Sequence, residues 1–102
     1  MTAPNAIHSG LIRLHILHHS VKEPVFGLGI IEELGRHGYR LSAGTIYPLL
    51  HGLEREGYLR SFKKRSGRQA RRLYRATSKG RQALHEGRTK VRELFAELFE
   101  DE

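Results

Sequence analysis

The chain has 102 residues, of which 18 are lysine or arginine and 11 are acidic, so that its formal net charge is +7. This length suits one domain with a small core and leaves little room for a large enzyme cleft. The chain contains no cysteine, which excludes disulfides, thiolate nucleophiles and zinc fingers. No apolar run approaches the roughly 20 residues of a membrane-spanning helix, and we therefore expect a cytoplasmic protein without membrane contacts.

Two helices are expected in the first part of the chain. Apolar residues recur at spacings of three and four from Ile7 to His19, which indicates an amphipathic helix. A break is expected over residues 20–24, because Pro24 disfavours helical geometry at the residue before it. A second helix is expected from Phe26 to His37, ended by Gly38 and burying Leu28, Ile31 and Leu34.

The third helix is expected to begin after Ser42 and to end at Gly57. The Ser42 hydroxyl is a suitable N-cap, and apolar residues then recur at helical spacing at Ile46, Leu49, Leu50 and Leu53. Pro48 lies near the second turn, where its missing N–H costs little only if the helix starts late or bends.

Two short strands and a last helix complete the predicted fold. The strands are expected at Tyr58–Arg65 and Arg71–Ala76, around a turn at Ser66-Gly67, and Thr77 or Ser78 is expected to cap the last helix. The predicted fold class is mainly α with a small two-stranded β wing. We expect a winged helix-turn-helix domain over residues 1–77 and a C-terminal dimerisation helix over residues 78–102.

The last helix has an apolar stripe that the rest of the chain can hardly cover. Leu84, Val91 and Leu98 lie seven residues apart, as in an approximate heptad. The stripe predicts a second subunit, although the helix could instead fold back on residues 7–17. The predicted dimer interface comprises Leu84, Gly87, Val91, Leu94, Phe95, Leu98 and Phe99 from the last helix, with Leu11 and Leu14 from the first.

Residues 60–81 carry ten lysine and arginine residues and no acid. Such a block attracts a polyanion, because phosphates that are neutralised release their counterions, although a solvated charged loop is the alternative. Arg68, next to Gly67 at the expected tip, is the candidate for insertion into a minor groove. The wing residues predicted to bind DNA are Lys63, Lys64, Arg65, Arg68, Arg71 and Arg72.

The first turns of the third helix are expected to approach the bases. Tyr47 can reach a phosphate or pack its ring on the core, and Ser42 can contact phosphate or act only as a cap. Arginine, asparagine and glutamine, the usual base readers, do not occur here, so that specificity would depend on the wing and on DNA shape. The helix residues predicted to bind DNA are Ser42, Ala43, Gly44, Thr45, Tyr47 and Pro48.

Two motifs resemble the PadR family of bacterial transcriptional regulators. Leu41–Leu50, LSAGTIYPLL, continued by Leu53–Leu59, LEREGYL, is similar to the family's recognition helix and wing entry. Gly67-Arg68 and Tyr74–Arg81 resemble the return strand of the wing and the following helix cap. The sequence departs from the family pattern at Gly27-Leu28-Gly29 in the second helix, at Gln69 in place of a proline, and at Leu73 in place of a second tyrosine.

The resemblance implies a homodimer with crossed C-terminal helices that usually acts as a repressor. In some members an aromatic effector binds at the dimer centre, but this chain has no tryptophan with which to sandwich one. We predict a dimeric repressor that binds double-stranded DNA at an inverted-repeat operator. The alternatives are a winged-helix protein-interaction module without specific DNA binding, and a sensor of aromatic ligands.

Catalysis and metal binding have little support in the sequence. No nucleophile motif, phosphate-cradling loop or acid–base pair is found, and we expect neither enzyme activity nor a cofactor. His8, His15, His18 and His19 suggest a metal site, and His15 and His19 share a helix face. Two histidines are too few for a closed site, and we therefore predict no bound metal.

Overall fold

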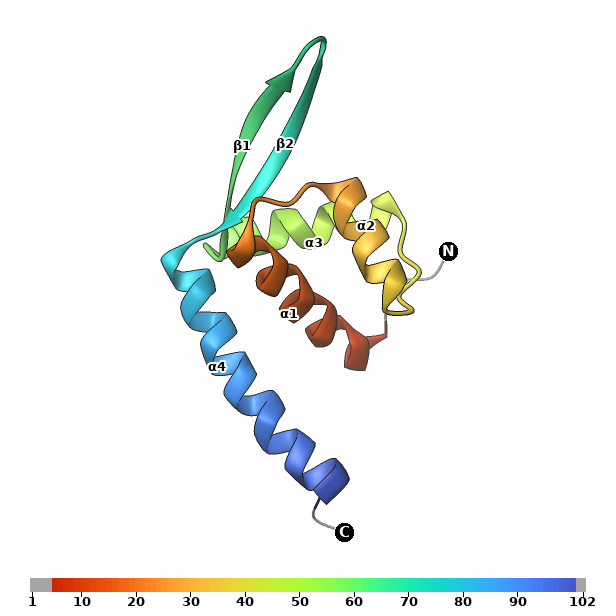
Figure 1. Ribbon diagram of the computed structural model, residues 1–102, viewed down its shortest axis with the longest axis vertical. Helices are drawn as coiled ribbons and strands as arrows, with labels where there is room; N and C mark the ends of the chain where they lie inside the picture. The colour runs from red at the N-terminus through yellow and green to blue at the C-terminus, as the bar shows by residue number, and fades with distance from the viewer. Residues whose placement is uncertain (1–4, 101–102) are drawn as a thin grey trace.

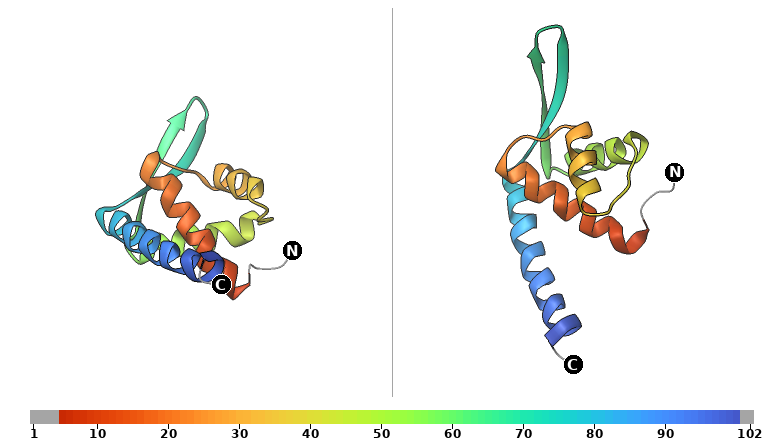
Figure 2. Two further views of the ribbon diagram at one scale, coloured as in Figure 1. Left: turned by 60° about the horizontal axis from the view of Figure 1, so that its bottom comes forward. Right: turned by 45° about the vertical axis from the view of Figure 1, so that its right-hand side comes forward.

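The computed structural model describes residues 5–100 and confirms a mainly helical chain with a two-stranded wing (Figure 1). The first three helices form a compact body, from which the β-hairpin and the last helix project at opposite ends (Figures 1 and 2). The elements in chain order are α1 Ala6–Lys22, α2 Gly27–Arg36, α3 Ala43–Arg55, β1 Leu59–Ser66, β2 Gln69–Ala76, α4 Ser78–Phe95 and a terminal π-helical turn, Ala96–Glu100.

Helix α1 ends at Lys22, three residues later than the predicted end at His19. The expected break at Ser20 is absent because this side chain is buried and its hydroxyl donates to the carbonyl of Leu17 at 3.0 Å. A serine whose hydroxyl bonds to the preceding turn is compatible with a helix. The helix ends only where Glu23, the residue before Pro24, becomes extended, as the proline requires.

Helix α3 ends at a glycine in the left-handed conformation, as predicted. Gly57 has φ +87°, its N–H donates to the carbonyl of Glu54 at 2.9 Å, and the N–H of Tyr58 donates to the carbonyl of Leu53 at 2.9 Å. These two bonds form a Schellman motif. Helix α2 ends in the same way at Gly38, also at φ +87°.

The face that α2 buries differs from the prediction. Leu28 is 64% exposed, whereas Ile30 and Leu34 are buried. The cause is Gly27, where a Cβ atom would overlap the ring of Tyr47. This close approach of α2 to α3 sets the rotation of α2, so that positions 27, 30 and 34 face the core. Ile31, also predicted to be buried, only packs at the edge of the core.

Helix α3, the wing and α4 meet at one junction, formed by residues 57–58 and 77–80. Thr77 caps α4 by accepting a hydrogen bond from the Gly80 N–H at 3.0 Å, and its hydroxyl donates to the Gly57 carbonyl at 2.6 Å. Its N–H donates to the carbonyl of Tyr58 at 3.0 Å. A Cβ atom at Gly80 would overlap that carbonyl oxygen, and the junction therefore requires glycine there.

The base of the wing is also attached to the body by its second strand. Tyr74 is wholly buried, and its backbone pairs with Val25 in the α1–α2 connection through hydrogen bonds of 2.9 and 2.7 Å. Burial raises the pKa of the Tyr74 hydroxyl, which keeps this group neutral at physiological pH. The extended α1–α2 connection is thus joined to β2 by an isolated antiparallel β-bridge.

A carboxylate attaches the first strand to α3. The side chain of Glu54 accepts hydrogen bonds from the Ser61 N–H at 2.9 Å and from the Ser61 hydroxyl at 2.7 Å. Arg72 donates to the same hydroxyl at 2.9 Å. The Ser61 hydroxyl bond is the main cause that lowers the pKa of Glu54, with smaller contributions from the Ser61 N–H and the nearby charge of Arg72.

Helix α4 packs on α1 only over its first half. Leu84 lies against the core, and Gly87 leaves space for Leu14, whose Cδ2 would be 2.6 Å from a Cβ atom at that glycine. The second half extends away from the body (Figure 2). Along the described part of the chain, no helix has both the length and the apolar character needed to cross a membrane.

We predict that Glu54→Gln lowers the free energy of unfolding by about 1 kcal/mol at pH 7, because charge-assisted hydrogen bonds to Ser61 are weakened. The folded-state pKa of Glu54 is lowered, so this stabilisation is present above the unfolded-state pKa of about 4.3. It is lost as the pH falls through the folded-state value. Urea unfolding from pH 7 to pH 3 measures both effects.

The matched control is Glu56→Gln, since Glu56 is exposed and its side chain forms no hydrogen bond within residues 5–100. Equal losses of stability in the two variants would show that the Glu54–Ser61 contact does not stabilise the wing.

Candidate nucleic-acid interface

One side of α3 faces solvent along its whole length. Ile46, Leu50 and Leu53 are buried, so the opposite side of the helix carries the exposed residues. These are Ala43, Gly44, Pro48, His51 and Arg55. The helix continues through Pro48 without interruption. The sequence analysis missed His51 and Arg55, which lie three and seven residues after Pro48 and could have been found by continuing that face along the helix.

Ser42 is the N-cap of α3 by its backbone conformation, but its side chain makes no capping hydrogen bond. The expected hydroxyl cap is therefore wrong. Its carbonyl accepts instead from the N–H groups of Thr45 and Ile46, both at 3.0 Å. The hydroxyl remains available for an outside partner, and a helix N-terminus favours an anion there.

Tyr47 lies half-buried between α3 and α2. Its ring and hydroxyl contact the backbone of Gly27, and its ring centroid lies 6.3 Å from that of His51. Of the two interpretations of Tyr47, the one in which its ring packs on the core therefore agrees with the structure. Gly27, the first residue of the run Gly27-Leu28-Gly29, makes this contact sterically feasible.

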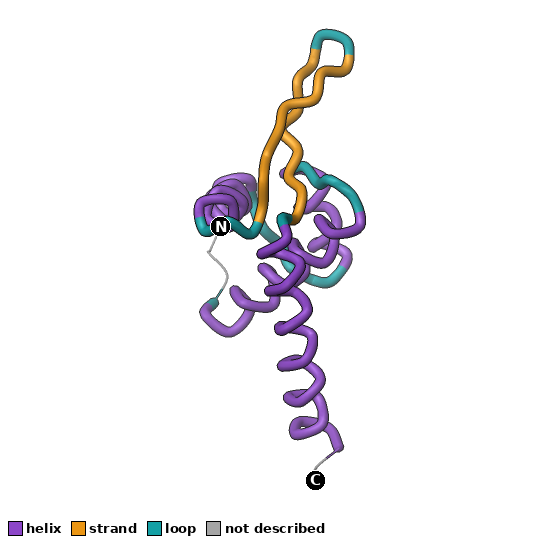
Figure 3. The backbone as a smooth tube through the Cα atoms, turned by 90° about the vertical axis from the view of Figure 1, so that its left-hand side faces the viewer, coloured by secondary structure: helices purple, strands orange, loops and turns teal. Residues whose placement is uncertain are grey.

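The wing is an antiparallel hairpin whose strands extend further than predicted (Figure 3). Ser66 pairs with Gln69, so the turn lies at Gly67-Arg68, one residue beyond the expected position, with Gly67 at φ +61°. In the strands, Lys63 is directly opposite Arg72, and Lys64 is opposite Arg71. Like charges in opposite positions destabilise a sheet, and a bound polyanion would remove this cost.

The six predicted wing residues divide into two groups by their contacts. Arg71 stacks on the ring of Phe26 at 4.4 Å, and Arg72 bonds to Ser61. Within residues 5–100 the other four form no ion pair, side-chain hydrogen bond or cation–π contact. These four, which we term the tip cations, are Lys63, Lys64, Arg65 and Arg68. They lie in the half of the hairpin furthest from the body.

The predicted dimer residues fall into two sets. Leu84 and Gly87 of α4 pack toward α1, and Leu14 of α1 packs against α4. This contact agrees in part with the alternative in which the last helix folds back on the first. Leu11 is 42% exposed at the edge of this contact. The remaining residues are exposed at the projecting end of the chain: Val91, Leu94 and Phe95 on α4, and Leu98 and Phe99 on the π-helical turn that continues it.

The histidines are also placed differently from the expectation. His8 packs edge-on against Tyr39, and His18 lines a groove between α1 and α4. His15 and His19 meet a third histidine, His37, from the end of α2. Sequence spacing could not reveal this contact, because His37 belongs to another helix.

Comparisons with known proteins agree with this geometry. The family model described as "Transcriptional regulator PadR-like family" matches residues 16–86. The transcriptional regulator Rv3488 of Mycobacterium tuberculosis is 51% identical over 88 residues, which cover 86% of this chain and 82% of that protein.

Solved structures show the same fold. A PadR-like transcriptional regulator from Bacillus cereus superposes with a TM-score of 0.81 at 28% identity, covering 96% of this chain and 100% of that one. A PadR family regulator from Eggerthella lenta gives a TM-score of 0.78 at 29% identity, covering 94% and 88%. This chain belongs to the PadR-like family of transcriptional regulators.

Proposed function

We propose that the protein is a cytoplasmic, sequence-specific DNA-binding regulator, that it acts as a homodimeric repressor at an inverted-repeat operator, and that it has no catalytic role. The observation that carries this proposal is the set of tip cations, which form no ion pair within residues 5–100. They lie on the hairpin that follows α3, a helix with one side exposed to solvent. Phosphates supply the missing negative charge, and their binding releases counterions.

We propose that α3 and the wing contact different parts of the DNA. The first turns of α3 expose small residues, Ala43 and Gly44, that allow the backbone to approach a major groove closely. Ser42 and Thr45 supply hydroxyls, and Arg55 adds a guanidinium, which is suited to phosphate or guanine. Because the first turns offer no bidentate base reader, we propose that DNA shape at the wing contributes to specificity.

We propose that Arg71 and Arg72 contribute less to DNA binding than the tip cations do. Both have partners within the chain, Phe26 and Ser61, which hold their side chains near the base of the wing. Arg68 at the turn has no such contact. We therefore propose Arg68 for the minor groove and the remaining tip cations for the flanking backbone.

We predict that Arg68→Ala weakens binding to an operator duplex, selected from a random library, by about tenfold at 0.15 M salt. It should also lower the slope of log affinity against log salt by about two, because each dimer loses two cations and each cation releases about one counterion. Fluorescence anisotropy over a salt series measures both quantities.

Arg75→Ala provides the control for charge alone. Arg75 is exposed on the same strand pair, but it lies near the base with its guanidinium 5.7 Å from the ring of Phe62. If selection from the random library enriches no sequence, the interaction-module alternative would be favoured. Equal losses of affinity in Arg68→Ala and Arg75→Ala would favour it as well.

The dimer is proposed from the projecting half of α4. Its apolar residues and those of the π-helical turn that continues it are 43–66% exposed, and a stripe of this kind is normally covered by a partner. Because α4 is continuous with the wing junction, pairing of two copies would fix the distance between two recognition helices. The boundary between the DNA-binding and dimerisation units at residues 77 and 78 is part of the same proposal. We also propose the dimer interface as the place where a small aromatic effector would bind.

We predict that Leu94→Glu weakens the dimer at least about a hundredfold, because a carboxylate would be buried without a partner. Sedimentation velocity at micromolar concentration should then show a monomer that retains its helical circular dichroism. Thr89→Glu, which adds the same charge five residues earlier on the helix, should remain dimeric. A wild-type monomer at these concentrations would refute the α4 interface.

A further inference from the structure

Three histidines and a carboxylate converge on the side of the body where α1 passes the end of α2. His15 and His19 lie one turn apart on α1, and His37 follows the last residue of α2. One ring nitrogen from each lies within 4.8 Å of the others. The rings of His15 and His37 are stacked, with centroids 4.8 Å apart.

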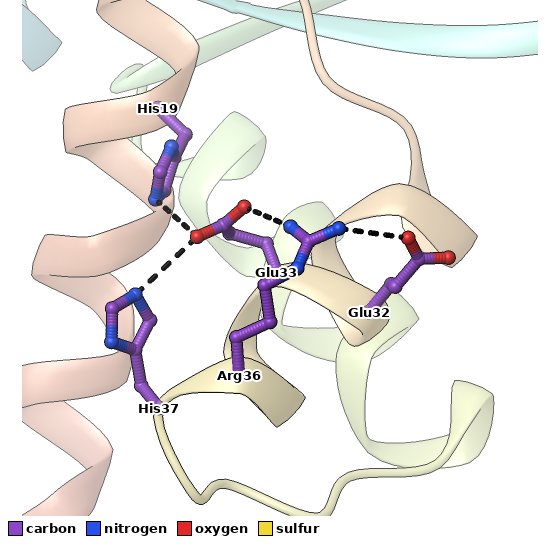
Figure 4. Close-up of polar contacts among 5 residues, drawn as sticks. All are labelled: His19, Glu32, Glu33, Arg36 and His37. Atoms are coloured by element: carbon purple, nitrogen blue, oxygen red, sulfur yellow. Dashed lines mark hydrogen bonds and ion pairs between the residues drawn. The ribbon is translucent and has the colours of Figure 1, made fainter.

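Glu33 closes this cluster from α2 (Figure 4). One of its carboxylate oxygens, Oε2, lies 3.7 Å from Nε2 of His19 and 3.3 Å from Nε2 of His37. The other oxygen, Oε1, accepts a hydrogen bond from Arg36 at 2.6 Å. Arg36 thereby holds the carboxylate with one oxygen turned toward the histidines.

We infer that His15, His19, His37 and Glu33 form a binding site for a borderline divalent transition-metal ion, for which Zn²⁺ is the probe. Three imidazoles and one carboxylate oxygen provide the four ligands of a tetrahedral zinc site. The three histidines are the one group of three or more candidate ligand residues within 4.8 Å of one another among residues 5–100, and Glu33 adds a carboxylate oxygen beside two of them, His19 and His37.

The geometry requires only a small adjustment to bind the ion. Nitrogen ligands about 2.0–2.1 Å from a tetrahedral ion are about 3.3 Å from one another. The ring nitrogens must therefore move closer by at most about 1.5 Å, which rotations of the His side chains can provide. His37 precedes Gly38, outside the regular helix, and this position gives it the most freedom.

Access and ligand chemistry also agree with such an ion. The side chains of His19, Glu33 and His37 are 25%, 27% and 47% exposed, so an ion can enter from solvent. Imidazole with carboxylate suits zinc, nickel or copper(II), whereas a site for calcium or magnesium would consist of oxygen ligands.

The first test is calorimetric titration of the untagged, chelator-treated protein with ZnCl₂. We expect one ion per chain, with an affinity at least tenfold weaker in His19→Gln and in His37→Gln. The controls are His8→Gln and His85→Gln, which change histidines outside the cluster and should leave the affinity unaltered. Binding that falls equally in the control variants, or no saturable binding, would overturn the site.

A second measurement avoids variants that fail to fold. X-ray absorption of the wild-type zinc complex should show nitrogen and oxygen ligands at about 2.0–2.1 Å, with the outer-shell scattering of three imidazoles. A first shell composed mainly of water, with one imidazole or none, would show that Glu33 only pairs with the histidines as charged groups. The expected complex should also melt at a higher temperature than the metal-free protein.

Discussion

The arrangement of this protein depends on the junction at which Gly57 and Tyr58 meet Thr77 and Gly80. Helix α3 ends there, β1 begins and β2 finishes there, and α4 starts there. One side chain, Thr77, is hydrogen-bonded to the backbone on both sides of the contact. The position of the wing and the direction of α4 are thus both set relative to α3 by backbone groups that have little freedom.

This constraint connects the two proposed surfaces. A dimer contact on the outer half of α4 would be transmitted through a continuous helix to Thr77, and from there to the end of α3. The Glu54–Ser61 contact attaches the wing to α3 on the other side of the junction. The tip cations can therefore be held far from the body, with their mutual repulsion unrelieved until a polyanion binds.

The sequence predicted those features that depend on local chemistry. The glycines at 38 and 57, the Thr77 cap and the buried stripe of α3 all followed from spacing and backbone preference, and the structure confirms them. One error came from a contact between two helices, and another from a hydrogen bond within α1. Leu28 is exposed because Gly27 admits Tyr47, and α1 continues through Ser20 because a buried hydroxyl finds a helix carbonyl.

In the candidate sites, too, features that depend on local sequence were predicted, and features that depend on packing between elements were not. The tip cations could be identified from composition and turn position alone, whereas the internal partners of Arg71 and Arg72 required the packing of Phe26 and Ser61. The histidine cluster was missed for a related reason. His37 lies 18 positions after His19 in the sequence, and only the antiparallel approach of two helices brings them together.

The central claim is that the exposed side of α3 and the tip of the wing form one DNA-binding surface. Amide chemical-shift mapping of the dimer against a selected operator duplex tests this claim most directly. We expect the largest changes at residues 42–48, at His51 and Arg55, and at residues 63–68, with small changes along the outer half of α4. Changes concentrated on α4 or α1, with the wing tip unaffected, would contradict it.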